Sequence, residues 1–92
     1  MANRSLDKGG LQRLAKLLDE ESSWPLDYLF KFIVPSAQVD LVKALFPPGI
    51  VSIRQSRTGK YQSVSATLSL PDSGSIVEVY RQAALIPGLM AL

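Results

Sequence analysis

The sequence contains neither cysteine nor histidine among its 92 residues. Without cysteine, the chain has no disulfide framework, no thiolate metal site and no catalytic thiol. Without histidine, it lacks the commonest general base and the commonest metal ligand. Serines are plentiful, but a serine without a base is a poor nucleophile, and nothing in the sequence marks Lys31 or Lys60 as a buried base. Because the acidic residues are also scattered, we expect a protein that is not an enzyme, with no catalytic residues, no metal and no cofactor.

Long hydrophobic runs and a strong net charge are also missing. No apolar stretch approaches the ~20 residues that a membrane helix needs, and residues 1–10 lack the apolar centre of a secretory signal. We therefore expect a cytoplasmic protein with no membrane partner. The net charge of +2 is too small to argue for a nucleic-acid partner, although the isoelectric point near 9.2 leaves one open.

What the chain does contain is typical of one small folded domain. Apolar residues make up 47% of the chain and charged residues 20%, which is the balance of a globular protein rather than a disordered one. A domain of this size buries only about 60% of the surface that its unfolded chain exposes. Its stability is therefore marginal, and a partner subunit would help.

Residues 57–70 show the clearest pattern in the chain. Small polar residues stand at 63, 65, 67 and 69, and apolar residues stand at 64, 66, 68 and 70. This period of two predicts a long strand with one buried face and one open face. The open face is polar but uncharged, with Tyr61 at its head. Thr58 and Gly59 precede the strand with turn chemistry, so residues 50–56 and 61–70 form a hairpin.

The N-terminal part of the chain divides into a loose tail, residues 1–10, and a short amphipathic helix, residues 11–21. This helix is either an appendage, folded over one face of the protein or frayed, or a helix that docks a partner. We prefer the appendage, because isolated helices this short are marginal in water. Residues 1–23 therefore form a tail and helix, and residues 24–92 form the domain.

The rest of the chain alternates strands and helices. Strands are predicted at 26–34, 50–56, 61–70 and 89–92. A helix that Ser36 can cap precedes the hairpin, and a second helix follows it. The motif Ser75-x-x-Glu78 fits a capping box for the second helix, with Asp72 as a competing cap.

The order β-α-β-β-α-β predicts an α+β, ferredoxin-like sandwich with a four-stranded antiparallel sheet and two helices on one face. The other face is open unless a ligand, the helix at 11–21 or a second copy covers it. The strand pattern places the following residues on it: Leu29, Lys31, Ile33, Ser52, Arg54, Tyr61, Ser63, Ser65, Thr67, Met90 and Leu92.

Several local signatures resemble the YbeD-like family of bacterial proteins, over residues 24–92. They are Trp24-Pro25-Leu26-Asp27-Tyr28, Phe30-Lys31-Phe32-Ile33, the run Ser56 to Ser65, Val79-Tyr80-Arg81 and Pro87-Gly88-Leu89-Met90-Ala91-Leu92. The chain departs from the family at Val34-Pro35, where a glycine is frequent, and at Ile86, where a histidine is frequent. The resemblance implies a ferredoxin-like fold close to the ACT regulatory domain. It also implies a small-ligand sensor that dimerises through its sheet, with a family label that points to lipoate metabolism.

Three cations surround the predicted hairpin: Arg54, Arg57 and Lys60. They could hold a phosphate or carboxylate, with Tyr61, Ser63 and Ser65 supplying directional hydrogen bonds. Cations at such an edge are more often solvated and protect the protein from aggregation.

An apolar strip on the open face, made by Leu29, Ile33, Met90 and Leu92 with Lys31 beside them, is a candidate interface for a homodimer or another protein. The helix at 11–21 could equally cover it. The leading hypothesis is a regulatory module that binds a small molecule or a protein through this face and the hairpin. The alternative is an RNA- or nucleotide-binding domain, because the RNA-recognition fold has the same topology. Only Tyr61 supplies a ring for base stacking, so a nucleic-acid partner is less favoured.

Overall fold

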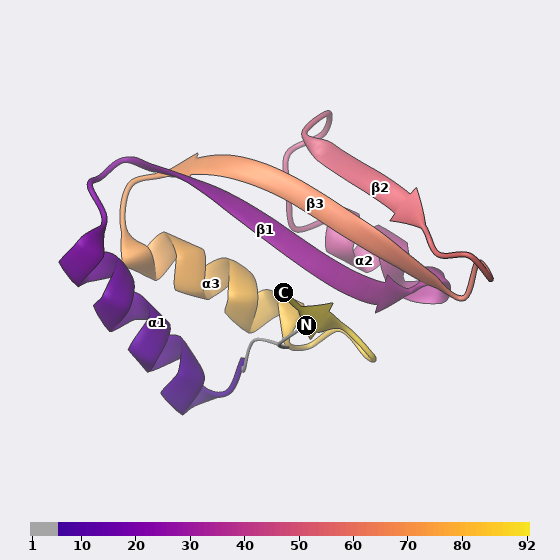
Figure 1. Ribbon diagram of the computed structural model, residues 1–92, viewed down its shortest axis with the longest axis horizontal. Helices are drawn as coiled ribbons and strands as arrows, with labels where there is room; N and C mark the ends of the chain where they lie inside the picture. Colours follow the sequence, from indigo (N-terminus) through magenta and orange to yellow (C-terminus); the bar gives the residue numbers. More distant parts are fainter. Residues whose placement is uncertain (1–5) are drawn as a thin grey trace.

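The computed structural model describes residues 6–92 (Figure 1). After an N-terminal helix, the chain follows the predicted order of one strand, one helical segment, two strands, one helix and one strand. The elements are α1 (Lys8–Glu21), β1 (Leu26–Pro35), the 3₁₀ turn η1 (Ser36–Gln38), α2 (Val39–Lys43), β2 (Val51–Gln55), β3 (Tyr61–Leu70), α3 (Ser73–Ala83) and β4 (Met90–Ala91).

The four strands form one antiparallel sheet in the order β2-β3-β1-β4. The two long strands, β1 and β3, lie side by side in the interior and pair over ten residues, from Leu26 opposite Leu70 to Pro35 opposite Tyr61. Strand β2 pairs over five residues and β4 over two, so each covers only part of its neighbour. The predicted α+β architecture with a four-stranded antiparallel sheet is confirmed.

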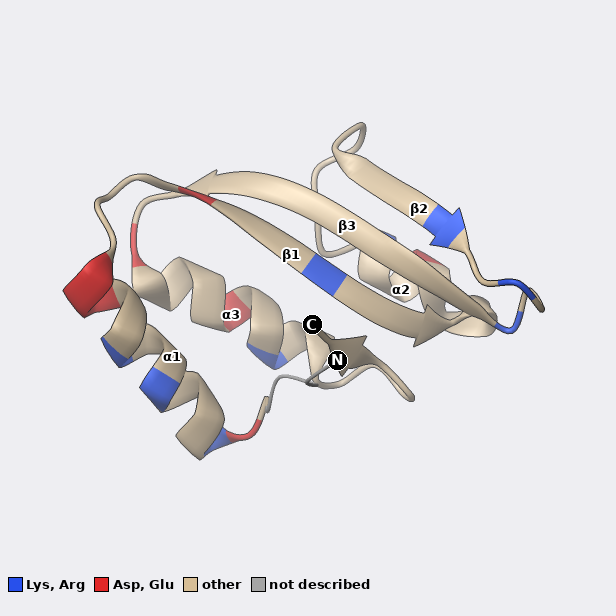
Figure 2. Ribbon diagram, in the orientation of Figure 1, with Lys and Arg blue, Asp and Glu red and all other residues tan. Residues whose placement is uncertain are grey.

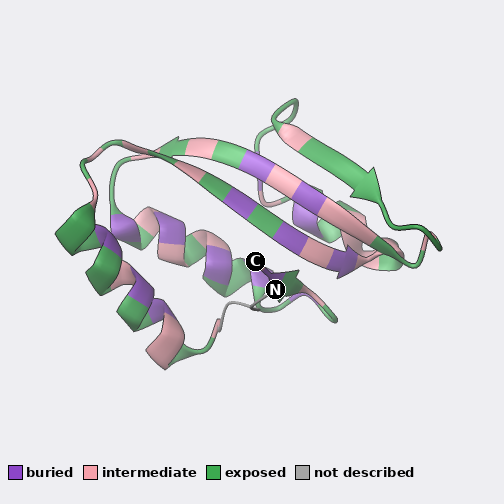
Figure 3. Ribbon diagram, viewed as in Figure 1, coloured by how far each residue is buried: buried purple, intermediate pink, exposed green. Residues whose placement is uncertain are grey.

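One face of the sheet carries the core. Phe30, Phe32 and Val34 of β1 and Val64 of β3 are fully buried, and they alternate with exposed or half-buried residues, as a period of two requires (Figure 3). The rings of Phe30 and Phe32 both contact Phe46, which follows α2. Both also contact Tyr80 of α3. Side chains from the α2 region and from α3 therefore pack on the same face of β1.

The structure overturns one predicted helix cap and decides between the two candidates for another. Ser36 does not cap the helix after β1, because its hydroxyl donates to the backbone carbonyl of Gly59 instead, and α2 begins only after η1. For α3, the competing cap Asp72 is confirmed and Ser75 is not the cap. Asp72 is the N-cap, and its carboxylate accepts from the backbone N–H and the hydroxyl of Ser75 at 2.8 Å each. The ionised carboxylate of Asp72 makes a charge-assisted hydrogen bond to an orphan N–H group of the first turn, which is stronger than a bond to a neutral acceptor.

Helix α1 is longer than predicted, because it begins at Lys8 rather than at residue 11. Asp7 is its N-cap and accepts a hydrogen bond from the backbone N–H of Gly10. The tail that we expected at 1–10 is therefore partly helical, and its first five residues lie outside the described part of the chain. The buried residues of α1 are Leu11, Leu14 and Leu18, and its contacts are with α3.

The position of α1 decides what covers the sheet. Figure 1 shows α1 beside α3, on the same side of the sheet as the other helices. The helix does not cover the opposite face of the sheet, where Leu29 remains 58% exposed. None of the helices between residues 6 and 92 is long and apolar enough to cross a membrane.

Candidate functional site

The loop at residues 57–60, which joins β2 to β3, is held by hydrogen bonds at its base and at its side. The N–H of Ser56 donates to the carbonyl of Tyr61 at 2.9 Å, and the N–H of Gly59 donates to the carbonyl of Ser56 at 3.1 Å. Gly59 has a φ of 77°, a left-handed conformation that favours glycine. Ser36 fixes the side of the loop: its hydroxyl donates to the Gly59 carbonyl, and its N–H donates to the Lys60 carbonyl at 2.9 Å.

This geometry determines where the three predicted cations lie. Arg54 lies on β2 directly opposite Ser63 of β3, while Arg57 and Lys60 lie in the anchored loop that continues from the same two strands. All three side chains are exposed. The structure therefore places them at one end of the sheet, with Tyr61, which is 46% exposed, at the start of β3 beside them.

The register brings most of the predicted residues of the open face into two long rows that cross the sheet, and Leu29 lies opposite Thr67 in a shorter row. One row runs Arg54, Ser63, Ile33, Met90 across all four strands. The second row runs Ser52, Ser65, Lys31, and its far end is extended by Leu92, whose N–H donates to the Lys31 carbonyl at 2.9 Å. Each row is polar on the β2 and β3 side and apolar towards β4.

The apolar side of these rows remains accessible. Met90 is 40% exposed and Ile33 and Leu92 are half-buried, while Lys31 and Leu29 are exposed. The face is the surface of a twisted sheet, with no second layer of described residues on it. Such a surface suits a broad contact with a macromolecule better than it suits the burial of a small ligand, because small-molecule sites are usually concave.

Opposite charges gather at the two ends of the molecule (Figure 2). Residues 51–60 contain three cations and no carboxylate. The end of α1 and the loop before α3, at the far end of the long strands, carry acidic residues. The pKa of Asp72, in that loop, lies below its ordinary value because the backbone N–H and the hydroxyl of Ser75 stabilise the carboxylate.

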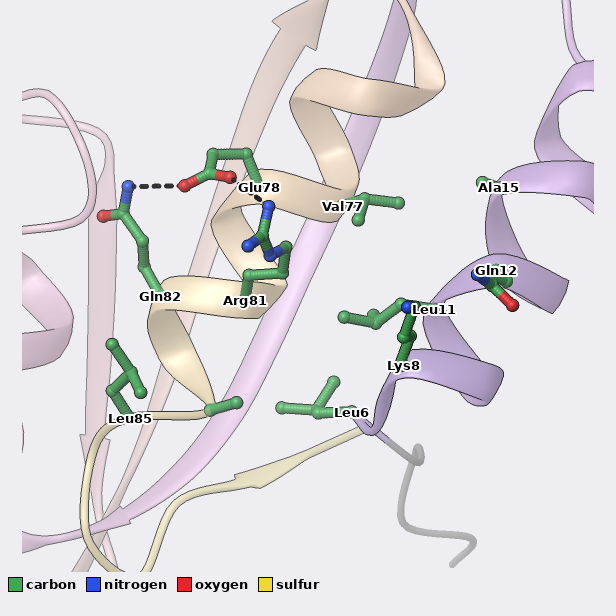
Figure 4. A pocket seen from close by; sticks show the side chains of 11 residues that line it. Leu6, Lys8, Leu11, Gln12, Ala15, Val77, Glu78, Arg81, Gln82 and Leu85 are labelled. Carbon is green, nitrogen blue, oxygen red and sulfur yellow. Dashed lines mark hydrogen bonds and ion pairs between the residues drawn. The ribbon is translucent and has the colours of Figure 1, made fainter.

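A groove with a volume of about 720 Å³ lies elsewhere, between α1 and α3 (Figure 4). Leu6 and Leu11 line it from the side of α1, and Val77 and Leu85 line it from the side of α3. Arg81 at its rim is paired with Glu78 at 3.3 Å. None of the residues that the sequence singled out as a site lines this groove, so it is separate from the open face and the hairpin.

The acidic side chains of the described residues do not form a metal site. Between residues 6 and 92, no three Asp, Glu, His or Cys side chains gather closely enough to hold a metal ion.

Comparison of the chain with protein-family models, with curated proteins and with solved structures finds no match.

Sequence reasoning missed the role of Ser36, which anchors the hairpin and does not cap a helix. The signal was that β1 and β3 are long enough to bring residue 35 beside the start of β3. Ile53 lies on the core side of the sheet, opposite Val64, as the alternation of the strand predicts, but it is 42% exposed because β2 is an edge strand.

Proposed function

We propose that residues 24–92 form a ferredoxin-like, ACT-like domain of the YbeD-like kind and that the protein is a cytoplasmic, non-enzymatic binding module. Its contact surface is the open sheet face together with the hairpin loop at 57–60. The antiparallel sheet with β1 and β3 in its interior, and the contact of both the α2 region and α3 with one face, support the fold assignment. A partner that carries carboxylate or phosphate groups suits the three cations.

The single observation that carries this proposal is the position of α1. Because α1 packs on α3, the apolar side chains of the open face keep much of their surface in water, with Leu29 58% and Met90 40% exposed. Apolar patches on small proteins that are rimmed by polar residues usually mark a contact surface. None of the open-face residues lines the groove at α1 and α3, and an open sheet surface favours a protein partner over a small molecule as the ligand.

Charge reversal tests the role of the hairpin. A thermal-shift screen of the full chain against amino acids, lipoate, nucleotides and short RNAs identifies compounds that raise the melting temperature, since a ligand at 100 times its Kd stabilises by about 2.7 kcal/mol. We expect Arg57→Glu to abolish any such shift. Lys16→Glu on α1 makes the same change in net charge far from the hairpin, so it should keep the shift. An Arg57→Glu variant that responds like the wild type would refute the anion contact.

The second candidate is an RNA- or nucleotide-binding domain, and the exposed ring of Tyr61 beside three cations is the observation that favours it. Binding of single-stranded RNA that falls steeply with added salt and is lost in Tyr61→Ala supports this candidate. Saturable binding of a compound with a carboxylate or phosphate group that is kept in Tyr61→Ala and lost in Arg57→Glu supports the first.

A further inference from the structure

The outer edge of β2 has unpaired backbone groups. Strand β2 is at the end of the sheet and pairs only with β3 among the described residues. Ser56, just after β2, donates its N–H to the carbonyl of Tyr61. These two residues continue the pairing of β2 with β3, so Ser56 turns its backbone groups towards β3. Hydrogen-bonding positions alternate along an antiparallel strand. The N–H and C=O groups of Val51, Ile53 and Gln55 therefore point away from β3, into solvent.

The side chains of β2 on the core side of the sheet are also incompletely buried. No residue of β2 is buried, although Ile53 lies opposite Val64, which is fully buried. Ile53 is 42% exposed, and Ile50, just before the strand, is 36% exposed. In Figure 3, β2 is the strand that lacks buried segments. Val51 packs against the core but Ile53 does not, so an added strand with apolar side chains on that side would extend the core.

The positive charges near this edge favour an added strand with acidic side chains. Arg54 projects on the open-face side of β2, because it lies opposite Ser63, and Arg57 and Lys60 follow in the loop. The segment 51–60 contains no carboxylate. A strand with acidic residues on its open-face side would meet these cations in charge-assisted hydrogen bonds.

We propose that the outer edge of β2 takes an extended acidic segment of a partner protein as a fifth strand, antiparallel to β2, so that the residues opposite Val51, Ile53 and Gln55 turn their N–H groups towards β2. Apolar residues at alternate positions of the segment lie with Ile53 on the core side, and the acidic residues between them face Arg54 and the loop cations. Main-chain hydrogen bonds supply affinity, and the alternating side chains supply specificity. This inference rests on the proposed binding function and names its partner.

A second copy of this chain fits the edge less well. Antiparallel pairing of two β2 strands about Ile53 would place the two Arg54 side chains on the same face as diagonal neighbours, roughly 8 Å apart. That separation is within a Debye length of about 8 Å at physiological salt, so the repulsion is not screened away. An acidic segment replaces this repulsion with attraction, which is why we choose it.

Backbone-modified peptides test the proposal with the full chain. The probe is a fluorescein-labelled peptide of sequence Gly-Glu-Val-Glu-Ile-Glu-Val, titrated with protein and followed by fluorescence anisotropy. In one variant the Val and Ile amides are N-methylated, which removes the donors that would face β2. The matched control carries N-methyl groups on the Glu amides, which face away from β2. We expect the first modification to weaken binding at least about tenfold and the control to change it less than about threefold.

Hydrogen exchange locates the peptide on the protein. We expect bound peptide to slow the exchange of the amides of Val51, Ile53 and Gln55, which point outward. The amides of Ser52 and Arg54 already face β3, so their exchange should change little. Arg57→Glu should weaken binding about tenfold, and Lys16→Glu should not.

The outcomes separate this inference from the proposed function. Equal binding of both N-methylated peptides, with loss in Arg57→Glu, would overturn the added strand and leave an anion-contacting module. Absence of peptide binding, self-association that blocks the three outward amides, or binding of single-stranded RNA alone would also overturn the added strand. In these three cases the thermal-shift screen still decides the proposed function.

Discussion

Leu14 gives the sharpest test of how α1 is attached to the domain. It lies in the middle of α1 and is only 7% exposed, whereas Leu17 on the same helix is 51% exposed. The two residues share chemistry and helix position, so their replacement by alanine changes helix propensity equally. A difference between Leu14→Ala and Leu17→Ala therefore measures the contact of α1 with α3.

The expected size follows from burial. Leu→Ala in a packed site costs about 2–5 kcal/mol, and the lower end applies where the neighbours can collapse into the space. The contact of α1 with α3 is a two-helix packing near the surface, so we expect about 2 kcal/mol for Leu14→Ala and less than about 0.5 kcal/mol for Leu17→Ala. For a domain of this size, 2 kcal/mol lowers the melting temperature by roughly 8–16 °C.

Urea unfolding followed by circular dichroism measures both variants. With a slope of about 1 kcal/mol per molar, the midpoint of Leu14→Ala should fall by about 2 M, with an unchanged slope. Equal and small effects of the two substitutions would show that α1 is not docked in solution. A slope that falls with the midpoint would show that α1 unfolds separately, which would also contradict a single cooperative unit.

Two further predictions concern the connections of the domain. Asp72→Ala should lower the melting temperature at neutral pH, because it removes the N-cap of α3. The pKa of Asp72 is lower in the folded protein than in the unfolded chain. The stabilisation by Asp72 is therefore full above about pH 4 and is lost as the pH falls through the folded-state pKa. The gap between wild type and variant, measured by thermal melts from pH 7 to pH 2, should therefore close in acid. A constant gap would contradict the charged cap. Gly88→Ala should destabilise by about 1–3 kcal/mol, since Gly88 has a φ of 76° and an added Cβ would stand 2.7 Å from Pro35. Gly49→Ala is the control, because Gly49 has a φ of 91° with open space around it, so urea midpoints should place it between the wild type and Gly88→Ala.

Much of the site could be predicted because residues at alternate positions of a strand lie on the same face of the sheet. The residues assigned to the open face lie there together, since strands of period two keep one set of side chains on one face at any register that buries Phe30 and Val64. The pairing of Arg54 with Ser63 depends on the register of the hairpin, which the short loop at 57–60 imposes. The resemblance to a known family and the binding function stay predictions.

The rest could not be predicted because it depends on contacts between distant elements. Whether Ser36 caps a helix or anchors a loop depends on how far β1 runs beside β3, because both roles satisfy the same hydroxyl. The start of α1 was predicted three residues late, because Gly9 and Gly10 have poor helix propensity and the cap at Asp7 outweighs it.

By itself the sequence determined the kinds of elements, their order and their two-sided character, because these follow from local periodicity, prolines and glycines. Only the tertiary structure decided that α1 lies on α3, since an amphipathic helix can bury the same leucines on either side of a sheet. That choice leaves the open face in water. The tertiary structure also decided that β2 is an edge strand without a buried residue, because the order of strands in a sheet depends on contacts between distant elements, which no local pattern encodes.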